Sequence, residues 1–89
     1  QNFTTATDSQ NTAVGFQAAR SVTTGIENAF FGARAGRSLT DADKNTAIGE
    51  EALNTDTLGS KTTAIGYRAL YNQNFTTATD SNNVAVGFD

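Results

Sequence analysis

A short apolar pattern recurs five times along the chain, and each copy closes on a glycine. The copies read NTAVGF at 11–16, NAFFGA at 28–33, NTAIGE at 45–50, TTAIGY at 62–67 and NVAVGF at 83–88. Successive strand residues point to opposite faces, so two neighbouring apolar positions predict a short strand that is covered on both faces. The position before the glycine is always β-branched or aromatic, which suits a strand: Val14, Phe31, Ile48, Ile65 and Val86.

The closing glycines define the period of the repeat. Gly15, Gly32, Gly49 and Gly66 are 17 residues apart, and the last step, to Gly87, is 21 residues. A fixed period this short is typical of stacked units that bury their apolar residues against their neighbours. We expect the glycine column to provide a positive φ or a close backbone approach at a corner of each unit.

A longer period lies over the short one. Residues 1–15 match residues 73–87 at an offset of 72 residues, which is three steps of 17 and one of 21. The extra residues therefore belong to one connection, Tyr71–Asn83, and we interpret residues 1–89 as one repeat segment taken from a longer array. A longer loop on a regular stack projects outward at little cost. The candidate outward positions are Asn74, Phe75, Thr76, Thr77 and Asp80.

Two architectures fit a 17-residue unit, and both belong to the all-β class. The first is a parallel β-solenoid, or β-roll, whose rungs stack about 4.7–4.9 Å apart. The second adds one-turn helical corners at 50–53 (EEAL) and 67–70 (YRAL), segments too short to form stable helices alone. So narrow a coil encloses little core, and its strands are apolar on both faces. We therefore expect a homotrimer with the column Val14 to Val86 as its seam, and a monomeric solenoid is the alternative.

One copy departs from the others in a paired way. Phe30 stands where the other copies have alanine, and Gly36 stands where the two following copies have Leu53 and Leu70. If Phe30 and Gly36 face each other, the exchange of one large and one small residue conserves volume.

Composition excludes several classes of function. The chain has no Cys or His, so disulfides, thiol chemistry and His/Cys metal sites are excluded. A net charge of −3, spread along the sequence, argues against nucleic-acid binding. No apolar run approaches the ~18 residues that a membrane span needs. We expect no cofactor and no metal: the D-x-D-x-N start at 41–45 resembles a calcium loop, but Thr46 and Ala52 replace its glycine and its glutamate.

The sequence also argues against an enzyme. Carboxylates occur in pairs at Glu50–Glu51 and at Asp41 with Asp43, but neighbours on a strand point apart, and acids on turns are usually solvated. With no His or Cys, an ordinary general base or thiol nucleophile is missing.

The unit (N/T)-T-A-(V/I)-G, followed by x-x-A-L and a Thr/Asn-rich loop, resembles two families of repeats. It is similar to the repeats of trimeric autotransporter adhesin heads, and more so to the NTAIG-type repeats in the shafts of bacteriophage tail-fibre-like proteins. The resemblance covers the whole chain and implies a trimeric, extracellular structural segment on a virion fibre or a bacterial cell surface. The adhesin repeat is shorter than 17 residues, so handedness does not carry over from its left-handed roll.

The leading hypothesis is a non-enzymatic segment that holds a distal binding tip, with any receptor or surface glycan bound through the parent protein. The alternative is a binding surface on the solenoid flank, for glycan or for ice. Thr12, Thr46 and Thr63 form part of a threonine rank, but Ala29 and Val84 interrupt it. For glycan, the aromatic candidates are Phe3, Tyr67, Tyr71 and Phe75.

Overall fold

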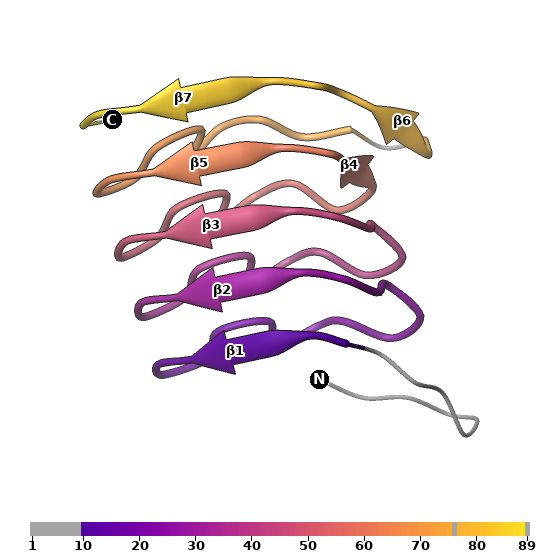
Figure 1. Ribbon diagram of the computed structural model, residues 1–89, viewed down its shortest axis with the longest axis horizontal. Coiled ribbons are helices and arrows are strands. Elements are labelled where there is room, and N and C mark those ends of the chain that lie inside the picture. The colour runs from indigo at the N-terminus through magenta and orange to yellow at the C-terminus, as the bar shows by residue number, and fades with distance from the viewer. Residues whose placement is uncertain (1–9, 76, 89) are drawn as a thin grey trace.

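The computed structural model describes residues 10–75 and 77–88, which form an all-β, parallel β-solenoid of about four turns (Figure 1). Five three-residue strands lie side by side in one parallel sheet, in the order β1-β2-β3-β5-β7. They are β1 (Thr12–Val14), β2 (Ala29–Phe31), β3 (Thr46–Ile48), β5 (Thr63–Ile65) and β7 (Val84–Val86). On the opposite side of the coil, β4 (Gly59–Ser60) pairs with β6 (Thr79–Asp80). The predicted fold class, a parallel β-solenoid, is confirmed.

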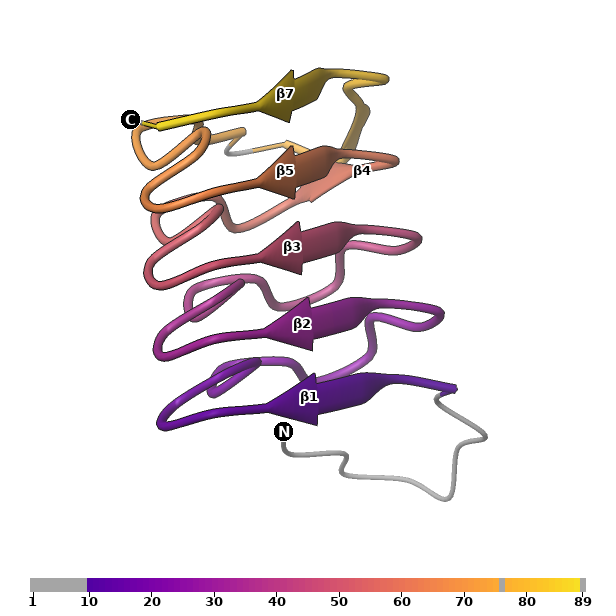
Figure 2. The same cartoon turned by 60° about the vertical axis from the view of Figure 1, so that its left-hand side comes forward.

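Each residue pairs with its equivalent in the next repeat. Ala13 lies opposite Phe30, and Phe30 lies opposite Ala47, so the register follows the sequence period. Backbone hydrogen bonds continue this pairing outside the strands: the Gly32 N–H donates to the Val14 carbonyl at 2.8 Å, and the Ala19 N–H donates to the Ala35 carbonyl at 3.0 Å. Successive turns therefore lie one above another with equivalent residues aligned, as Figure 2 shows for the strands.

The interior is narrow and filled mainly by small side chains. The middle residue of each inner strand points inward, and Phe30, Ala47 and Ala64 are fully buried. The alanine column that follows the glycines is buried in the same cluster, so alanine recurs in the interior of the coil. The other buried apolar residues are Ala19, Val22, Leu39, Ala42, Leu53 and, from that alanine column, Ala35, Ala52 and Ala69.

Phe30 fills the space that Gly36 leaves. A Cβ atom on Gly36 would lie 2.6 Å from the Phe30 ring. The ring is completely buried, and it occupies the volume that the leucine of the following copies takes. The prediction that these two residues face each other is confirmed.

The alternative with one-turn helical corners is wrong, because the described residues contain no helix. Glu51 and Leu53 have φ values of 59° and 54°, and Arg68 and Leu70 repeat them at 56° and 51°. A right-handed helix requires negative φ at every residue, so alternate left-handed residues turn the chain instead. Within residues 10–75 and 77–88 there is accordingly no helix long and apolar enough to cross a membrane.

Candidate functional site

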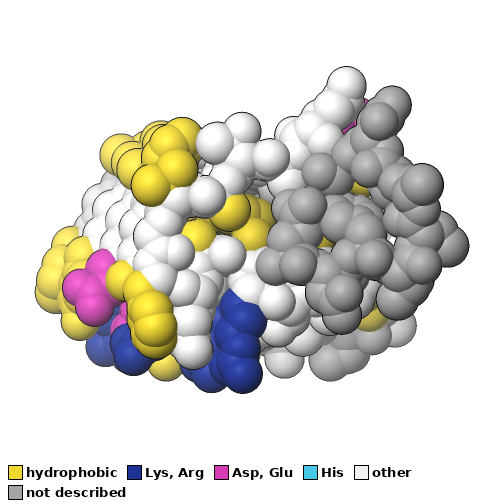
Figure 3. All heavy atoms as spheres, turned by 90° about the horizontal axis from the view of Figure 1, so that it is seen from below, with side chains coloured by type: hydrophobic (Ala, Val, Ile, Leu, Met, Phe, Trp, Pro, Cys, Tyr) yellow, Lys and Arg dark blue, Asp and Glu magenta, His cyan; other side chains and the backbone are white. Residues whose placement is uncertain are grey.

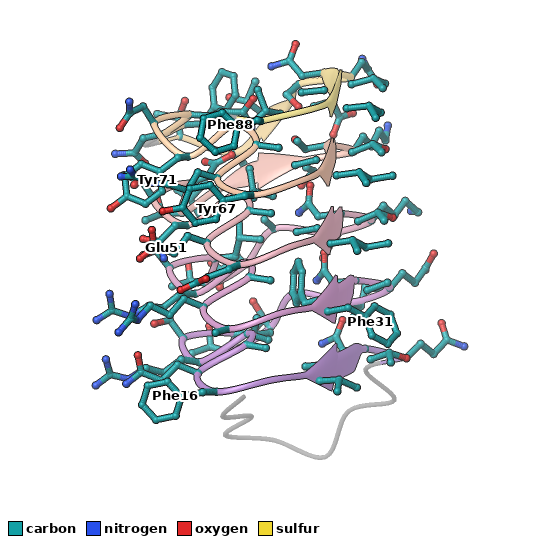
Figure 4. All side chains as sticks on the ribbon, turned by 90° about the vertical axis from the view of Figure 1, so that its left-hand side faces the viewer. Phe16, Phe31, Glu51, Tyr67, Tyr71 and Phe88 are labelled. Carbon is teal, nitrogen blue, oxygen red and sulfur yellow. The ribbon has the colours of Figure 1, made fainter. Side chains whose placement is uncertain are left out.

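An exposed apolar column runs up the outer face of the five-stranded sheet. We call it the seam column, and it consists of Val14, Phe31, Ile48, Ile65 and Val86. Phe31 and Ile48, in the middle of the stack, remain 41% and 39% exposed, and Phe31 points away from the coil (Figure 4). Strand alternation explains this, because the preceding residue of each strand fills the interior. In β2, β3 and β5 the coil therefore covers the middle residue and leaves the seam residue on the outside, where Phe31 and Ile48 are exposed and Ile65 is half-buried.

The corner glycines follow the seam column directly. Their φ values lie between 125° and 143°, a region that residues with a side chain rarely adopt. A Cβ atom on Gly32 would lie 2.6 Å from the backbone of Gly49, and one on Gly49 would lie 2.5 Å from that of Gly66. Both the backbone conformation and the close stacking of rungs thus require glycine in this column.

A ladder of asparagine side chains supports the corner that precedes each strand. The Asn28 N–H donates to the Asn11 Oδ1 at 2.8 Å, and the Asn45 N–H donates to the Asn28 Oδ1 at 2.9 Å. The Asn45 Oδ1 in turn accepts from the Thr62 N–H, and the Asn45 Nδ2 donates to the Gly59 carbonyl across the coil. Asn28 and Asn45 are buried, so this ladder pairs backbone groups that water cannot reach.

Replacing Asn45 with alanine should lower the free energy of unfolding by about 2–5 kcal/mol, because the Thr62 N–H and the Gly59 carbonyl would lose their buried partners. Urea-induced unfolding followed by circular dichroism measures the change. Asn45→Thr is the matched control, since threonine occupies the equivalent position at Thr62, and it should cost less. An alanine variant with an unchanged unfolding midpoint would contradict the role given to the ladder.

A buried carboxylate fixes the start of the longer connection. Asp56 is completely buried, and it accepts hydrogen bonds from the Gly59 N–H, the Phe75 N–H and the Gln73 side-chain amide. Val22 and Leu39 occupy the equivalent position in the two preceding units, so this column changes from apolar to polar at Asp56. Sequence reasoning did not single out Asp56 or the asparagines, although the recurrence of Asn in four of the five copies was a usable signal.

The structure corrects part of the predicted outward loop. Phe75 is half-buried, its N–H bonds Asp56, and its carbonyl accepts from the Leu58 N–H, as the 17-residue register requires. It therefore belongs to the rung, because Asp56 holds it there. Asn74, Thr77 and Asp80 are exposed, and Asp80 forms an ion pair with Lys61 at 2.7 Å. Thr76 and Phe3 lie outside the described residues.

A second group of exposed side chains lies around the corner from the seam column (Figure 4). Tyr67 stacks on Phe88 with ring centroids 5.3 Å apart, and the Arg68 guanidinium lies 4.1 Å from the Tyr71 ring centroid. Glu51 bridges Arg34 and Arg68 at 3.2 and 3.3 Å. The neighbouring Tyr71 side chain, together with Tyr67 and the Glu51 charge, raises the pKa of Arg68 above its ordinary value.

The acidic residues that could suggest a metal are engaged within the chain. Asp41 Oδ1 accepts from the hydroxyls of Thr23 and Thr24, and Asp43 Oδ1 accepts from the Ile26 N–H. In the part of the chain that the structure describes, no three His, Cys, Asp or Glu residues gather as a metal site.

The geometry thus defines a class of molecule: a glycine-cornered parallel β-solenoid with an apolar column on its outer face. Comparison with models of protein families, with curated protein sequences and with solved structures finds no match.

Proposed function

We propose that the chain is a non-enzymatic structural segment of an extracellular fibre, a tail fibre or a surface adhesin, and that it associates as a homotrimer. Its task is to hold a distal binding tip away from a virion or a bacterial cell. The observation that supports this best is the seam column, which leaves an apolar residue on the outside of all five rungs.

The seam column favours self-association over a free surface. Large apolar side chains exposed on one face are unfavourable in water. Burying them against another copy stabilises the assembly by roughly 25 cal/mol per Å² of apolar area removed from water. The column is regular along the stack, so an identical column from another copy matches it in spacing. Three copies around one axis would cover their three seam columns together, whereas in a single chain the seam column stays exposed to solvent.

Rigidity follows from the same architecture. Every rung is fixed to the next by parallel backbone hydrogen bonds and by the buried asparagine ladder. Bending the stack would break these bonds along one side. A stiff rod of this kind is suited to hold a distal tip at a fixed distance from the particle or cell.

The molar mass of the purified chain tests the proposal. Light scattering after size exclusion should give three times 9.3 kDa. Replacing Ile48 and Ile65 with aspartate should convert the trimer to a folded monomer, since both side chains lie on the outer sheet face and outside the coil. Asn72→Asp adds one negative charge, half the change of the double variant, at an exposed turn outside the strands, and this control should remain trimeric. A folded trimer of the double variant would contradict the proposal that the seam column forms the trimer interface.

The aromatic corner motivates a second candidate function, the binding of a glycan on the flank. Tyr67 and Phe88 present a stacked pair, each more than 40% exposed, beside the charged Arg68. Sugars stack on such faces, and the Thr rank adds hydroxyls on the neighbouring sheet. A monomeric wild-type chain that binds an oligosaccharide, and loses binding on Tyr67→Ala, would favour this function over the fibre segment.

A further inference from the structure

The five-stranded sheet ends in two edges that have no partner strand among residues 10–75 and 77–88. β1 forms one edge and β7 the other, at the two ends of the stack (Figure 1). All three residues of β1 are exposed, and so are Val84 and Val86 of β7. Figure 3 looks onto the β1 end and shows hydrophobic side chains grouped around it. A strand edge of this kind presents backbone N–H and C=O groups with which another chain can pair.

The glycine N–H of each rung bonds to the rung below. It donates to the carbonyl of the seam residue there at 2.7 or 2.8 Å, and the four pairs are Gly32 with Val14, Gly49 with Phe31, Gly66 with Ile48 and Gly87 with Ile65. Among the described residues, no rung above β7 uses the Val86 carbonyl and no rung below β1 uses the Gly15 N–H. The β7 edge therefore offers the acceptor, and the β1 edge the donor, of this same bond.

A second bond of the same kind lies two residues further along the chain. The Arg34 N–H donates to the Phe16 carbonyl at 2.7 Å, and the next rungs repeat the bond from Glu51 to Ala33 at 2.8 Å and from Arg68 to Glu50 at 2.9 Å. Within residues 10–75 and 77–88, the Phe88 carbonyl and the Gln17 N–H are the members left unused. Two acceptors at one end thus match two donors at the other in spacing and in order.

The side chains at the two ends match as well. Tyr67 and Phe88 belong to one column, the position after each corner glycine, and their stacked rings lie 5.3 Å apart on adjacent rungs. Phe16 opens that column in the first rung; it is 68% exposed and Phe88 is 76% exposed. Figure 4 shows both rings on the same side of the coil, at opposite ends of the stack. A copy placed on β7 would set its Phe16 on Phe88 and extend the aromatic stack from two rings to three.

Gly87 has the conformation of a stacked corner although nothing is stacked on it. Its φ of 143° lies in the same region as the 125–131° of the other corner glycines. A Cβ atom on any of those would contact the next rung, whereas one on Gly87 meets no atom within 4 Å. The β7 edge is therefore already shaped to receive a rung. The sequence of the first rung suits it, because residues 11–16 and 83–88 read NTAVGF and NVAVGF.

We propose that a second copy of this chain adds end to end, with its β1 pairing in parallel with β7. This inference does not rest on the proposed trimer, because it uses the ends of the stack and not the seam column. The added copy donates from its Gly15 and Gln17 N–H groups to the Val86 and Phe88 carbonyls, and its own β7 edge stays free. Such a contact joins two different surfaces and does not close, so further copies extend it into a filament.

Two single-cysteine variants test the junction, because the natural chain has no cysteine. F16C and F88C are purified separately in reduced form and mixed before oxidation. Adjacent rungs lie about 4.8 Å apart, which is within the Cα separation of a disulfide. The mixture should therefore give a covalent dimer on a non-reducing gel. Each variant oxidised alone should give much less, since two equivalent positions do not meet at this junction.

The matched control for the register mixes F16C with Y67C. Tyr67 stands in the same column as Phe88 but one rung further from the junction. Its thiol would lie about 10 Å from position 16 of the added copy, too far for a disulfide. This mixture should give no more covalent dimer than the single variants.

Gly87→Ala tests the same contact without a cross-link. A Cβ atom on Gly66 contacts the Gly87 carbonyl oxygen, so one on Gly87 would contact the corner of an added copy while meeting nothing in its own chain. Light scattering should show the molar mass of the natural chain rising with concentration above that of the oligomer found at high dilution. For Gly87→Ala, the concentration needed for this growth should rise at least about tenfold, with an unchanged circular dichroism spectrum.

The outcomes separate this inference from the proposed function. A natural chain that stays a trimer at every concentration, with no excess of dimer from F16C and F88C, would keep the trimer and reject end-to-end addition. A chain that is monomeric at high dilution but cross-links as expected would support end-to-end addition and reject the trimer. Equal cross-linking with Y67C, or growth of Gly87→Ala at the concentrations of the natural chain, would reject the pairing of β1 with β7.

Discussion

Alanine in place of Gly49 is expected to cost at least about 4 kcal/mol and so to remove most or all of the stability of the chain. Its Cβ would lie 2.5 Å from the Gly66 carbonyl oxygen, and the φ of 126° is itself unfavourable for alanine. The rung above is held by backbone hydrogen bonds on both sides of that carbonyl, so it cannot withdraw without breaking them. Circular dichroism during thermal unfolding, with the natural chain alongside, measures the effect.

Gly87 provides the matched control, because it shares the corner conformation without the contact. Its φ is 143°, yet no atom lies within 4 Å of a Cβ atom built there. Gly87→Ala should therefore cost only the backbone strain, roughly 1–3 kcal/mol. If the two alanine variants were equally stable, the close approach of successive rungs would not be what requires glycine.

The exchange of Phe30 and Gly36 is expected to show strong coupling between the two positions. Phe30→Ala alone should cost about 3–5 kcal/mol, because the buried ring leaves a cavity over Gly36. Gly36→Leu alone should also destabilise, since its Cβ would start 2.6 Å from the ring. The double variant should regain most of the loss, because it recreates the pair formed by Ala47 and Leu53 one rung on.

Backbone strain does not obstruct this rescue. Gly36 has a φ of 58°, and Leu53 occupies the equivalent position at 54°, so leucine already adopts this conformation elsewhere in the stack. A double-mutant cycle from urea unfolding should give a coupling energy above about 2 kcal/mol. Additive losses in the double variant would show that the two side chains do not share one space.

The same residues show where sequence reasoning succeeds and where it stops. The glycine spacing predicted the parallel stack, and the paired departure at Phe30 and Gly36 predicted a contact, because a repeat aligns equivalent positions in space as well as in sequence. The predicted helical corner at EEAL was wrong, because Glu51 and Leu53 have positive φ values. Helix propensity is a weak preference, and the stacking of each turn on the next in one register overrides it here. Asp56 escaped notice because its burial depends on the longer connection, which brings Phe75 and Gln73 to it.

By itself, the sequence determined the period, the all-β class, the corner glycines and the alternation of apolar positions along each strand. These features are local or strictly repeated, so the recurrence of one residue type at equivalent positions is enough to reveal them. The sequence analysis predicted the column Val14 to Val86 as the seam, but only the tertiary structure shows that the neighbouring column is the one that faces inward. Both faces of each strand are apolar, so periodicity cannot tell the interior from the surface, whereas closure of the coil buries Ala47 and leaves Ile48 outside. That choice creates the seam column and, with it, the basis for the proposed trimer.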